Sequence, residues 1–449
     1  MDLIFQNTIR HLETHEDIDM YKITIIGTGY VGLVTGACFA ELGNHVTCVD
    51  NDAKKIKKLK SLQMPIYEPG LYEMVKRNVE KKRLSFTDSI QKAVQDSLVI
   101  FIAVGTPPQE DGGADLTAIE NVARTIAKTM RSYKVIVEKS TVPVETGNWI
   151  EHTVKINLKK GVGFDVASNP EFLREGSAIY DFLNPDRIVI GVSSKKAKDI
   201  LLSLYKPIKA PKIVTDIRSA ELIKHASNSF LATKISFINA VARICEFSGA
   251  DILKVAEGLG LDRRIGRSFL DAGLGFGGFC LPKDLDAFIH ISDKLGYDFK
   301  LLKAVREINQ DQIEGFIGKV RSALWNIKDK QIGILGLSFK ANTDDLRFAP
   351  SLVVIKRLLE EGASVRVFDP QSMEKAKAIL KKIYYAKSAI DAARDCDCLL
   401  ILTEWDEFKE LDFVRLKKIM KYPLIIDGRN MYDKASLNKL GFTYIGIGR

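Results

Sequence analysis

Short apolar runs alternate with longer segments of helical spacing through the first half of the chain. Each run is five to seven residues long and rich in Val and Ile, as expected of strands buried on both faces of a sheet. Helical patterns separate most of the runs, and this alternation predicts a parallel sheet with helices on both faces. The expected strands cover residues 22–26, 45–50, 98–104, 134–140, 162–168 and 187–191.

A single long helix is predicted next, from about residue 216 to residue 247, with Gly249 as its stop signal. At ~1.5 Å per residue it would be roughly 45 Å long, which suits a helix that bridges two domains or pairs two subunits. Further helical material continues to about Trp325. The apolar positions that keep helical spacing are Ile223, Ala226, Phe230, Ile235, Ile238, Val241 and Cys245.

A second sheet pattern begins at KQIGILGLSFK and continues through ASVRVFDP, LLILTEW and PLIIDGRN. We therefore predict an α/β protein with two Rossmann-like doubly wound domains, joined by a long central helix and a helical middle domain. The expected parts are an N-terminal extension, the first Rossmann-like domain, a central helical and dimerisation domain and the second Rossmann-like domain, over 1–19, 20–215, 216–326 and 327–449.

Residues 1–19 precede the first strand without joining it, and Met20 stands directly before YKITIIG. They are interpreted as an extension, as the product of an upstream start codon taken in error, or as a disordered tail. The sequence assigns them no function.

Composition and charge narrow the class of protein. The chain has 449 residues, of which 46% are hydrophobic, and no apolar run approaches the roughly 20 residues of a membrane helix. The N-terminus carries acids and lacks the apolar core of a secretory signal. The net charge is +9, but segments such as KKIKKLK space their lysines as solvated helix faces do. We therefore expect a cytoplasmic protein that binds neither nucleic acid nor membrane.

The six cysteines fit neither a zinc site nor a disulfide framework, and we expect no metal. Cys396 and Cys398 alternate along an apolar run and are interpreted as small residues of one strand face. Cys280 alone has an unusual setting.

A dinucleotide fingerprint follows the first expected strand. Its glycines permit a tight turn and a close approach of backbone N–H groups to a pyrophosphate. Asp50, at the end of the next strand, can accept hydrogen bonds from the adenosine ribose and would repel a 2′-phosphate, so NAD is favoured over NADP. The fingerprint residues are Gly27, Gly29, Tyr30, Val31 and Gly32. Lys55 and Thr106 are further candidates, against the alternatives of a surface lysine and an ordinary turn.

The segment GLGFGGFCLPKDL, residues 273–285, carries the second candidate site. Its glycines predict a loop wrapped around a ligand, packed by Phe276 and Phe279. Cys280 precedes Lys283, and a nearby cation favours the thiolate form of a cysteine. With NAD bound, a nucleophilic thiolate points to aldehyde oxidation through a thiohemiacetal and a thioester.

Seven segments, in order, resemble the UDP-glucose/GDP-mannose dehydrogenase family, and the resemblance covers nearly everything from Met20 onward. It implies that one enzyme oxidises the C6 alcohol of UDP-glucose to the carboxylate of UDP-glucuronate and consumes two NAD. The segments are ITIIGTGYVGLVTG, EKSTVPV, SNPEFLREGSAIYDFLNPDRIVIG, ELIKHASNSFLATKISFIN, GFGGFCLPKD, LGLSFKANTDDLR and DGRN.

The resemblance also implies roles for individual residues. Cys280 would be the nucleophile, Lys224 and Asn228 would hold the oxyanion, and Glu171 would be the acid/base for thioester hydrolysis. Asp284 would orient water or Lys224, and Thr141 would hold a water. The remaining implied cofactor contacts are Thr141, Glu175, Lys283 and Arg347. The implied UDP-sugar contacts are Glu171, Phe172, Leu173, Lys224, Asn228, Arg264, Phe269, Gly273, Gly275, Phe276, Gly277, Phe339, Lys340 and Arg429. In the family Arg264 reaches the neighbouring subunit, so a homodimer or higher oligomer is implied.

Other activities stay open at this point. Within the family they are a GDP-mannose 6-dehydrogenase, a UDP-N-acetylhexosamine dehydrogenase or another UDP-hexose 6-dehydrogenase. NPEFLREG and the Lys-Asp pair after Cys280 favour the UDP-glucose branch, whereas Phe279 replaces the serine or tyrosine often found there. Outside the family they are an alcohol dehydrogenase that stops at the aldehyde and a non-catalytic nucleotide-sugar sensor.

Overall fold

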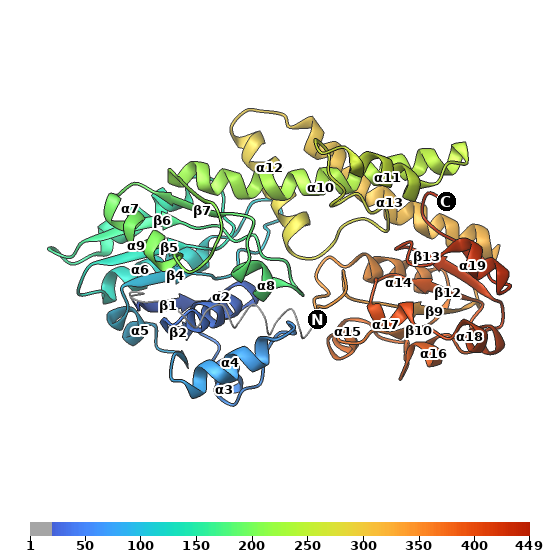
Figure 1. Ribbon diagram of the computed structural model, residues 1–449, viewed down its shortest axis with the longest axis horizontal. Helices are drawn as coiled ribbons and strands as arrows, with labels where there is room; N and C mark the ends of the chain where they lie inside the picture. The colour runs from blue at the N-terminus through green and yellow to red at the C-terminus, as the bar shows by residue number, and fades with distance from the viewer. Residues whose placement is uncertain (1–19) are drawn as a thin grey trace. The chain divides into compact units, whose positions relative to one another are not determined.

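The computed structural model describes residues 20–449, which divide into two compact units with the boundary between Ala226 and Ser227 (Figure 1). Each unit is described by itself. The expectation for residues 1–19 lies outside the described residues. The division into four parts that the sequence suggested stays a prediction.

The first unit contains an eight-stranded sheet with the order β3-β2-β1-β4-β5-β6-β7-β8. All neighbouring strands are parallel except β6 and β7, so the expectation of a wholly parallel sheet is wrong at this pair. A 19-residue connection that contains only the short helix α8 returns the chain from β6 to β7 in the opposite direction. The strands are β1 (Lys22–Ile26), β2 (His45–Val49), β3 (Leu84–Thr87), β4 (Val99–Ile102), β5 (Lys134–Glu138), β6 (Phe164–Ser168), β7 (Ile188–Val192) and β8 (Lys212–Thr215).

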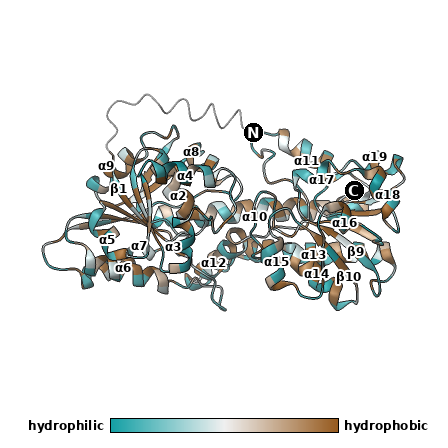
Figure 2. Cartoon of the chain, turned by 90° about the horizontal axis from the view of Figure 1, so that it is seen from below, coloured by the Kyte–Doolittle hydropathy of each residue, from teal (hydrophilic) through white to brown (hydrophobic). Residues whose placement is uncertain are grey.

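Helices cover both faces of this sheet, as the alternating pattern predicted. Ile23 and Ile25 of β1 pack in one apolar cluster with α2, α4, α8 and α9, whereas Ile26 of the same strand packs in a second cluster with α5, α6 and α7. The apolar strands form the centre of the unit in Figure 2. The helices are α2 (Tyr30–Glu41), α3 (Ala53–Lys60), α4 (Leu71–Glu80), α5 (Ile90–Asp96), α6 (Thr117–Thr129), α7 (Thr146–Asn157), α8 (Ala178–Leu183) and α9 (Lys195–Leu204).

The second unit contains a six-stranded parallel sheet with the order β11-β10-β9-β12-β13-β14. In chain order this is 3-2-1-4-5-6, the order of a Rossmann fold. Its strands are β9 (Gln331–Leu335), β10 (Ser364–Phe368), β11 (Tyr384–Tyr385), β12 (Cys398–Ile401), β13 (Leu424–Asp427) and β14 (Thr443–Ile445). Its helices beside the sheet are α14 (Pro350–Glu360), α15 (Met373–Ile379), α16 (Ala389–Ala392), α17 (Asp406–Lys409), α18 (Phe413–Ile419) and α19 (Lys434–Lys439).

The long helix is present as α10 (Ile217–Ser248), which begins in the first unit and ends in the second. Gly249, with φ of +77°, ends it. The helices that follow are α11 (Ile252–Leu261), α12 (Cys280–Lys294) and α13 (Lys300–Leu324). Cys280 is the first residue of α12, so the glycine loop leads directly into a helix N-terminus.

Candidate functional site

The turn after β1 has one glycine that leaves room for a ligand and two that do not. A Cβ on Gly27, whose φ is +103°, would lie 2.3 Å from the carbonyl oxygen of Ala103. A Cβ on Gly32 would lie 2.0 Å from the carbonyl oxygen of Gly27, so this glycine is needed for close packing. Gly29 caps α2 and has no neighbour within 4 Å of its Cβ position. The backbone at Gly29, Tyr30 and Val31 therefore fits the close approach of a pyrophosphate.

Asp50 follows β2 and is buried at the same turn. Its Oδ2 accepts hydrogen bonds from the backbone N–H of Thr28 at 3.0 Å and from the hydroxyl of Thr28 at 2.7 Å. Lys55 Nζ lies 2.7 Å from the same oxygen. Burial acts to raise the pKa of Asp50, but the bonds from Lys55 and Thr28 outweigh it and hold the pKa below its usual value. The carboxylate is thus ionised and fixed at the position of the ribose acceptor.

We expect Asp50→Ala to weaken NAD binding by at least about tenfold, because a hydrogen bond to a charged acceptor is lost. The preference for NAD over NADP should narrow as well. Isothermal titration with both cofactors measures this, with Asp52→Asn as the control, since Asp52 caps α3 through the N–H groups of Lys54 and Lys55. Unchanged NAD affinity in Asp50→Ala would remove Asp50 from the ribose role.

The second unit has an acid at the corresponding place, and the chain donates hydrogen bonds to both of its oxygens, as it does to both oxygens of Asp50. Asp369 follows β10, and its Oδ2 accepts from the N–H of Leu337 at 2.7 Å and from Trp405 Nε1 at 3.2 Å. Its Oδ1 accepts from the N–H groups of Gln371 and Ser372. The turn after β9 reads GLSFK and lacks the second and third glycines of the fingerprint. The dinucleotide signature therefore belongs to the first unit.

A buried ion pair forms the centre of the first unit's polar cluster. Lys224 Nζ on α10 lies 2.9 Å from Glu171 Oε1, and the two side chains are 4% and 3% exposed. The other carboxylate oxygen of Glu171 accepts from the N–H of Leu173 at 2.6 Å. Two cations lie near the ring of Phe172, with the Arg187 guanidinium 3.8 Å and Lys224 Nζ 5.4 Å from its centroid.

Lys139 belongs to this cluster and was missed in the sequence, although it lies in the EKSTVPV segment. It follows β5, and its Nζ donates to Asn169 Oδ1 at 3.0 Å. Burial lowers the pKa of Lys139 to about 8, although Glu171 and Glu138 act in the opposite direction. A small cavity of about 40 Å³ is lined by Lys139, Asn169, Glu171 and Arg187, among others. A cavity of this size has room for a water molecule.

Two residues of α10 hold the loop that carries Thr141, and the sequence did not predict this. Glu221 accepts from the N–H groups of Glu145 and Gly147, both at 2.7 Å, where α7 begins. His225 Nε2 lies 2.7 Å from the carbonyl oxygen of Val142. Thr106, predicted as a cofactor contact, donates its hydroxyl to the carbonyl oxygen of Thr141 at 3.0 Å.

Glu221 gives a pH-dependent stability. Burial raises its pKa to about 7, despite the two N–H donors. A carboxyl whose pKa is raised on folding contributes stability that is complete below about pH 4.5 and lost as the pH rises through 7, about 3 kcal/mol for a shift of this size. We expect Glu221→Gln to flatten the dependence of unfolding free energy on pH between pH 5 and pH 8, measured by urea denaturation. The control is Glu80→Gln, an exposed carboxylate of the same unit, which should keep the wild-type dependence. A Glu221→Gln variant whose unfolding free energy depends on pH as steeply as that of this control would contradict the prediction.

In the second unit, Cys280 begins α12 beside a buried network of three polar residues. Asp284 Oδ2 accepts from Asn228 Nδ2 at 2.6 Å, and Asp284 Oδ1 lies 2.6 Å from Lys283 Nζ. Asn228 comes from α10, one turn after Lys224, so the predicted spacing on one helix is confirmed. The N-terminus of a helix favours an anion such as a thiolate.

Cys280 is also set apart from the other five thiols. It is half-buried, whereas the others are buried. Burial raises the pKa of Cys48 and of Cys396 to about 12 and also raises the pKa of Cys38, Cys245 and Cys398. These five thiols are therefore poor nucleophiles at neutral pH.

Phe279, directly before the cysteine, packs against the predicted cofactor contacts of this unit. The Arg347 guanidinium lies 4.1 Å and Lys283 Nζ lies 5.6 Å from its ring centroid. The Arg347 guanidinium also donates hydrogen bonds to both carboxylate oxygens of Asp345. Both cations are thus held close to the aromatic ring that directly precedes the thiol.

The glycines of residues 273–278 are required by packing against the chain itself, which revises the reason that the sequence suggested for them. A Cβ on Gly275, whose φ is +97°, would lie 2.5 Å from Asn309 Oδ1. A Cβ on Gly277 would lie 2.4 Å from the carbonyl oxygen of Phe348, and one on Gly273 would lie 2.8 Å from that of Gly428. The loop is therefore closely packed rather than open.

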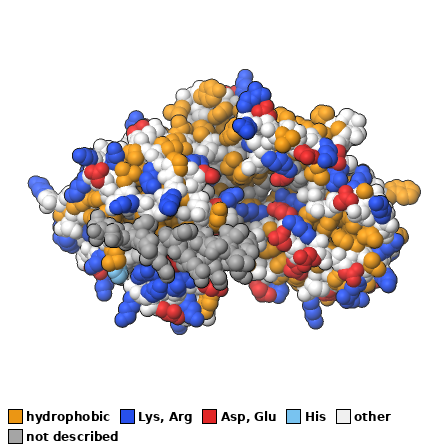
Figure 3. All heavy atoms as spheres, viewed as in Figure 1, with side chains coloured by type: hydrophobic (Ala, Val, Ile, Leu, Met, Phe, Trp, Pro, Cys, Tyr) orange, Lys and Arg blue, Asp and Glu red, His pale blue; other side chains and the backbone are white. Residues whose placement is uncertain are grey.

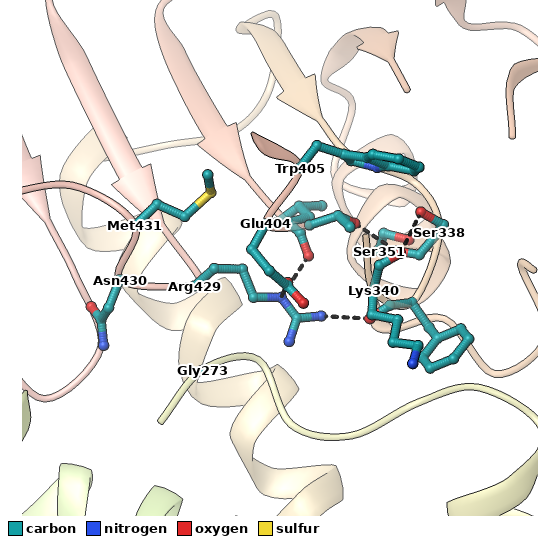
Figure 4. Close-up of polar contacts among 12 residues, drawn as sticks. Gly273, Ser338, Lys340, Ser351, Glu404, Trp405, Arg429, Asn430 and Met431 are labelled. Carbon is teal, nitrogen blue, oxygen red and sulfur yellow. Dashed lines mark hydrogen bonds and ion pairs between the residues drawn. The ribbon is translucent and has the colours of Figure 1, made fainter. Parts of the chain in front are cut away.

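Arg429 lies against this loop and the predicted residues Phe339 and Lys340. Figure 4 shows its guanidinium directed toward Glu404 and the backbone before Lys340, with Gly273 nearby. Its Nη2 donates to the carbonyl oxygen of Phe339 at 3.0 Å, and its Nε donates to that of Leu402 at 2.9 Å. These contacts place a cation beside the glycine loop, a combination suited to a diphosphate.

Three predicted residues are less closely tied to these groups. Arg264 pairs with Asp262 on an exposed loop, and its side chain is 88% exposed. Phe269 lies in the loop after α11 with φ of +65°. Glu175 is half-buried in the connection before α8.

Figure 3 shows basic and acidic side chains interspersed over the visible face, and the lysines of α3 other than Lys55 are exposed around buried Ile56 and Leu59. Among residues 20–449, no helix is long and apolar enough to span a membrane. The same residues contain no group of three or more His, Cys, Asp or Glu side chains arranged for a metal ion.

Three domain models of one family match successive parts of the chain. The NAD binding domain of the UDP-glucose/GDP-mannose dehydrogenase family matches residues 21–209, its central domain matches 218–311 and its UDP binding domain matches 333–434. The UDP-glucose 6-dehydrogenase TuaD of Bacillus subtilis is 50% identical over 96% of this chain and 94% of its own.

Solved structures agree with this match. A UDP-glucose dehydrogenase from Pyrobaculum islandicum superposes with a TM-score of 0.91 at 40% identity, over 97% of this chain and 99% of that one. A UDP-D-ManNAc dehydrogenase from Pyrococcus horikoshii superposes with a TM-score of 0.84 at 28% identity, over 95% of this chain and 99% of that one.

Proposed function

Because the chain belongs to the UDP-glucose/GDP-mannose dehydrogenase family, we propose that it oxidises the C6 alcohol of UDP-glucose to the carboxylate of UDP-glucuronate. The chain is an NAD-dependent oxidoreductase with a UDP-binding domain. The choice of UDP-glucose rests on relatives of 45–50% identity that carry the name UDP-glucose 6-dehydrogenase. The observation that supports the four-electron reaction is a half-buried thiol at the start of α12, beside the network of Asn228, Lys283 and Asp284.

The residues of the β1–α2 turn and Asp50 would hold the cofactor. Bound NAD supplies a hydride acceptor at C6, and two equivalents take up the four electrons. Oxidation of the alcohol also releases the hydroxyl proton, and we assign the carboxylate of Glu171 to accept it. The ion pair between them provides both a charged donor and a carboxylate in a buried setting, where each acts strongly on a nearby oxygen.

Cys280 carries the second half of the reaction. Its thiolate forms a C–S bond with the aldehyde carbon, and the resulting oxyanion is stabilised by donors, a role we assign to Lys224 and Asn228. The oxyanion of the thiohemiacetal then loses the remaining C6 hydride, which a second NAD would accept, and becomes a thioester. Without a covalent bond the aldehyde could leave before the second oxidation.

Water then completes the reaction. We assign Glu171 to accept a proton from the water that attacks the thioester, with Thr141 and Asp284 as groups that position water. The C–S bond breaks, the thiolate of Cys280 returns and the carboxylate leaves. The small cavity beside Glu171 and Lys139 is consistent with water on this side of the carboxylate.

The experiment that tests this function is a count of NADH formed per sugar consumed by the purified enzyme. UDP-glucose, GDP-mannose and UDP-N-acetylhexosamines are compared as substrates. We expect two NADH per UDP-glucose. One NADH would indicate an alcohol dehydrogenase that stops at the aldehyde, and none with any sugar would indicate a binding protein.

We further propose that two copies pair through α10. Phe230, Phe237 and Ile244 recur every seven residues on this helix and are 65%, 54% and 64% exposed, and Phe247 is 84% exposed. A heptad stripe of this kind is typical of a helix that packs against another helix. Arg264 is accessible to a second copy, and light scattering tests whether the enzyme has at least twice the mass of one chain.

The proposed site of action is the cytoplasm. All six cysteines are free thiols, which suits a reducing compartment.

A further inference from the structure

We infer that Asn309 of α13 is a positioning residue that fixes the glycine loop in the shape that binds the UDP-sugar. This inference rests on the proposed function, because it assigns the loop to the nucleotide sugar. Asn309 Oδ1 accepts from the N–H of Phe276 at 2.8 Å, and its Nδ2 donates to the carbonyl oxygen of the same residue at 3.1 Å. One side-chain amide thus pairs with both backbone groups of Phe276, as a neighbouring strand would.

At the start of the loop, two further side-chain amides together pair with both backbone groups of Gly273. The N–H of Gly273 donates to Asn239 Oδ1 at 2.9 Å, and Gln312 Nε2 donates to the carbonyl oxygen of Gly273 at 2.8 Å. Asn239 lies on α10, and Asn309 and Gln312 lie on α13, which Ser236 links to α10 through a hydrogen bond to Val305 (Figure 1). These three amides and the backbone bond from Leu274 to Gly428 hold the first half of the loop.

This pairing leaves other donors of the loop for a ligand. Among the described residues, no group accepts a hydrogen bond from the N–H of Gly275 or Gly277, and both residues are buried. A buried N–H normally has an acceptor, so an oxygen of the bound nucleotide sugar would complete both. Gly275, at φ of +97°, is in a conformation that a free loop would leave readily, and the two bonds from Asn309 to the next residue, Phe276, restrict it.

The functional consequence is preorganisation. A loop that is ordered before binding does not lose conformational freedom when the ligand arrives. Loss of the hydrogen bonds from Asn309 to Phe276 should therefore weaken the binding of substrate specifically. We expect Asn309→Leu to raise the KM for UDP-glucose about tenfold and to leave the KM for NAD within about twofold. Asn309→Asp, which keeps the acceptor but places a second oxygen against the Phe276 carbonyl, should give an intermediate rise.

The control is Gln310→Leu, which removes an exposed amide from the next position of the same helix. Steady-state kinetics with both substrates are combined with titration calorimetry of UDP-glucose and with melting temperatures. The inference is overturned if Asn309→Leu keeps the wild-type KM for UDP-glucose. It is also overturned if both KM values and the melting temperature change together, since that indicates general destabilisation. If wild-type enzyme does not bind UDP-glucose at all, the proposed function fails instead.

Discussion

Replacement of Cys280 by Ala should lower the rate of acid formation by at least about 10⁴-fold, because loss of a nucleophile removes the covalent route. Binding of UDP-glucose should survive, since the glycine loop and Arg429 are unchanged. Acid formation is measured by chromatography of the product and binding by titration calorimetry. Acid that accumulates at an undiminished rate would show that the covalent scheme is wrong.

The chain provides a matched control for this variant. Cys245 is a buried thiol of α10, and Cys245→Ser should retain acid formation. Brief treatment of the native enzyme with iodoacetamide should label Cys280 alone, because burial raises the pKa of the other five thiols. Peptide mapping identifies the labelled residue, and inactivation should follow its labelling.

Replacement of Lys224 by Met is expected to have the second large effect, and on two properties at once. It leaves the carboxylate of Glu171 buried without its ion-pair partner, which costs about 3–5 kcal/mol of folding stability. It also removes a cation assigned to the developing oxyanion, so kcat should fall by about 10²–10³-fold. Urea denaturation and steady-state kinetics measure the two effects.

A double-mutant cycle separates the ion pair from other effects of the substitution. Lys224→Met combined with Glu171→Leu should recover much of the lost stability but no activity, since a buried pair can be replaced by apolar residues. Arg124→Met, which breaks an exposed pair with Glu120 in the same unit, should cost no more than about 1 kcal/mol. A Lys224→Met variant as stable as this control would contradict the buried pair.

The sequence predicted the elements whose signal lies within a few residues. Buried strands such as β4 read as unbroken apolar runs, and α10 keeps helical spacing until Gly249 ends it. It missed β3 and β8, which lie at the two edges of the first sheet and alternate or expose their residues. It also missed the reversed direction of β7, because direction depends on how a connection folds rather than on the strand's own pattern.

Candidate site residues could be predicted where they belong to a sequence motif. The residues that hold them in place through hydrogen bonds could not be predicted. Glu221, His225 and Asn309 act through backbone groups 33 to 83 residues away, and no local pattern shows such a distance. Lys139 did leave a signal, since a lysine directly after the apolar strand β5 lies at the edge of a parallel sheet where ligands bind. The glycines of residues 273–278 were recognised, but the packing that requires them becomes visible only in the structure.

The covalent bond between the sugar and Cys280 is most directly tested by rapid acid quench during turnover with UDP-glucose and NAD. The quenched enzyme is digested and analysed by mass spectrometry. We predict a peptide in which Cys280 carries the uronyl group as a thioester that hydroxylamine removes. Two NADH per sugar without any adduct on Cys280, at quench times when turnover is under way, would contradict the account.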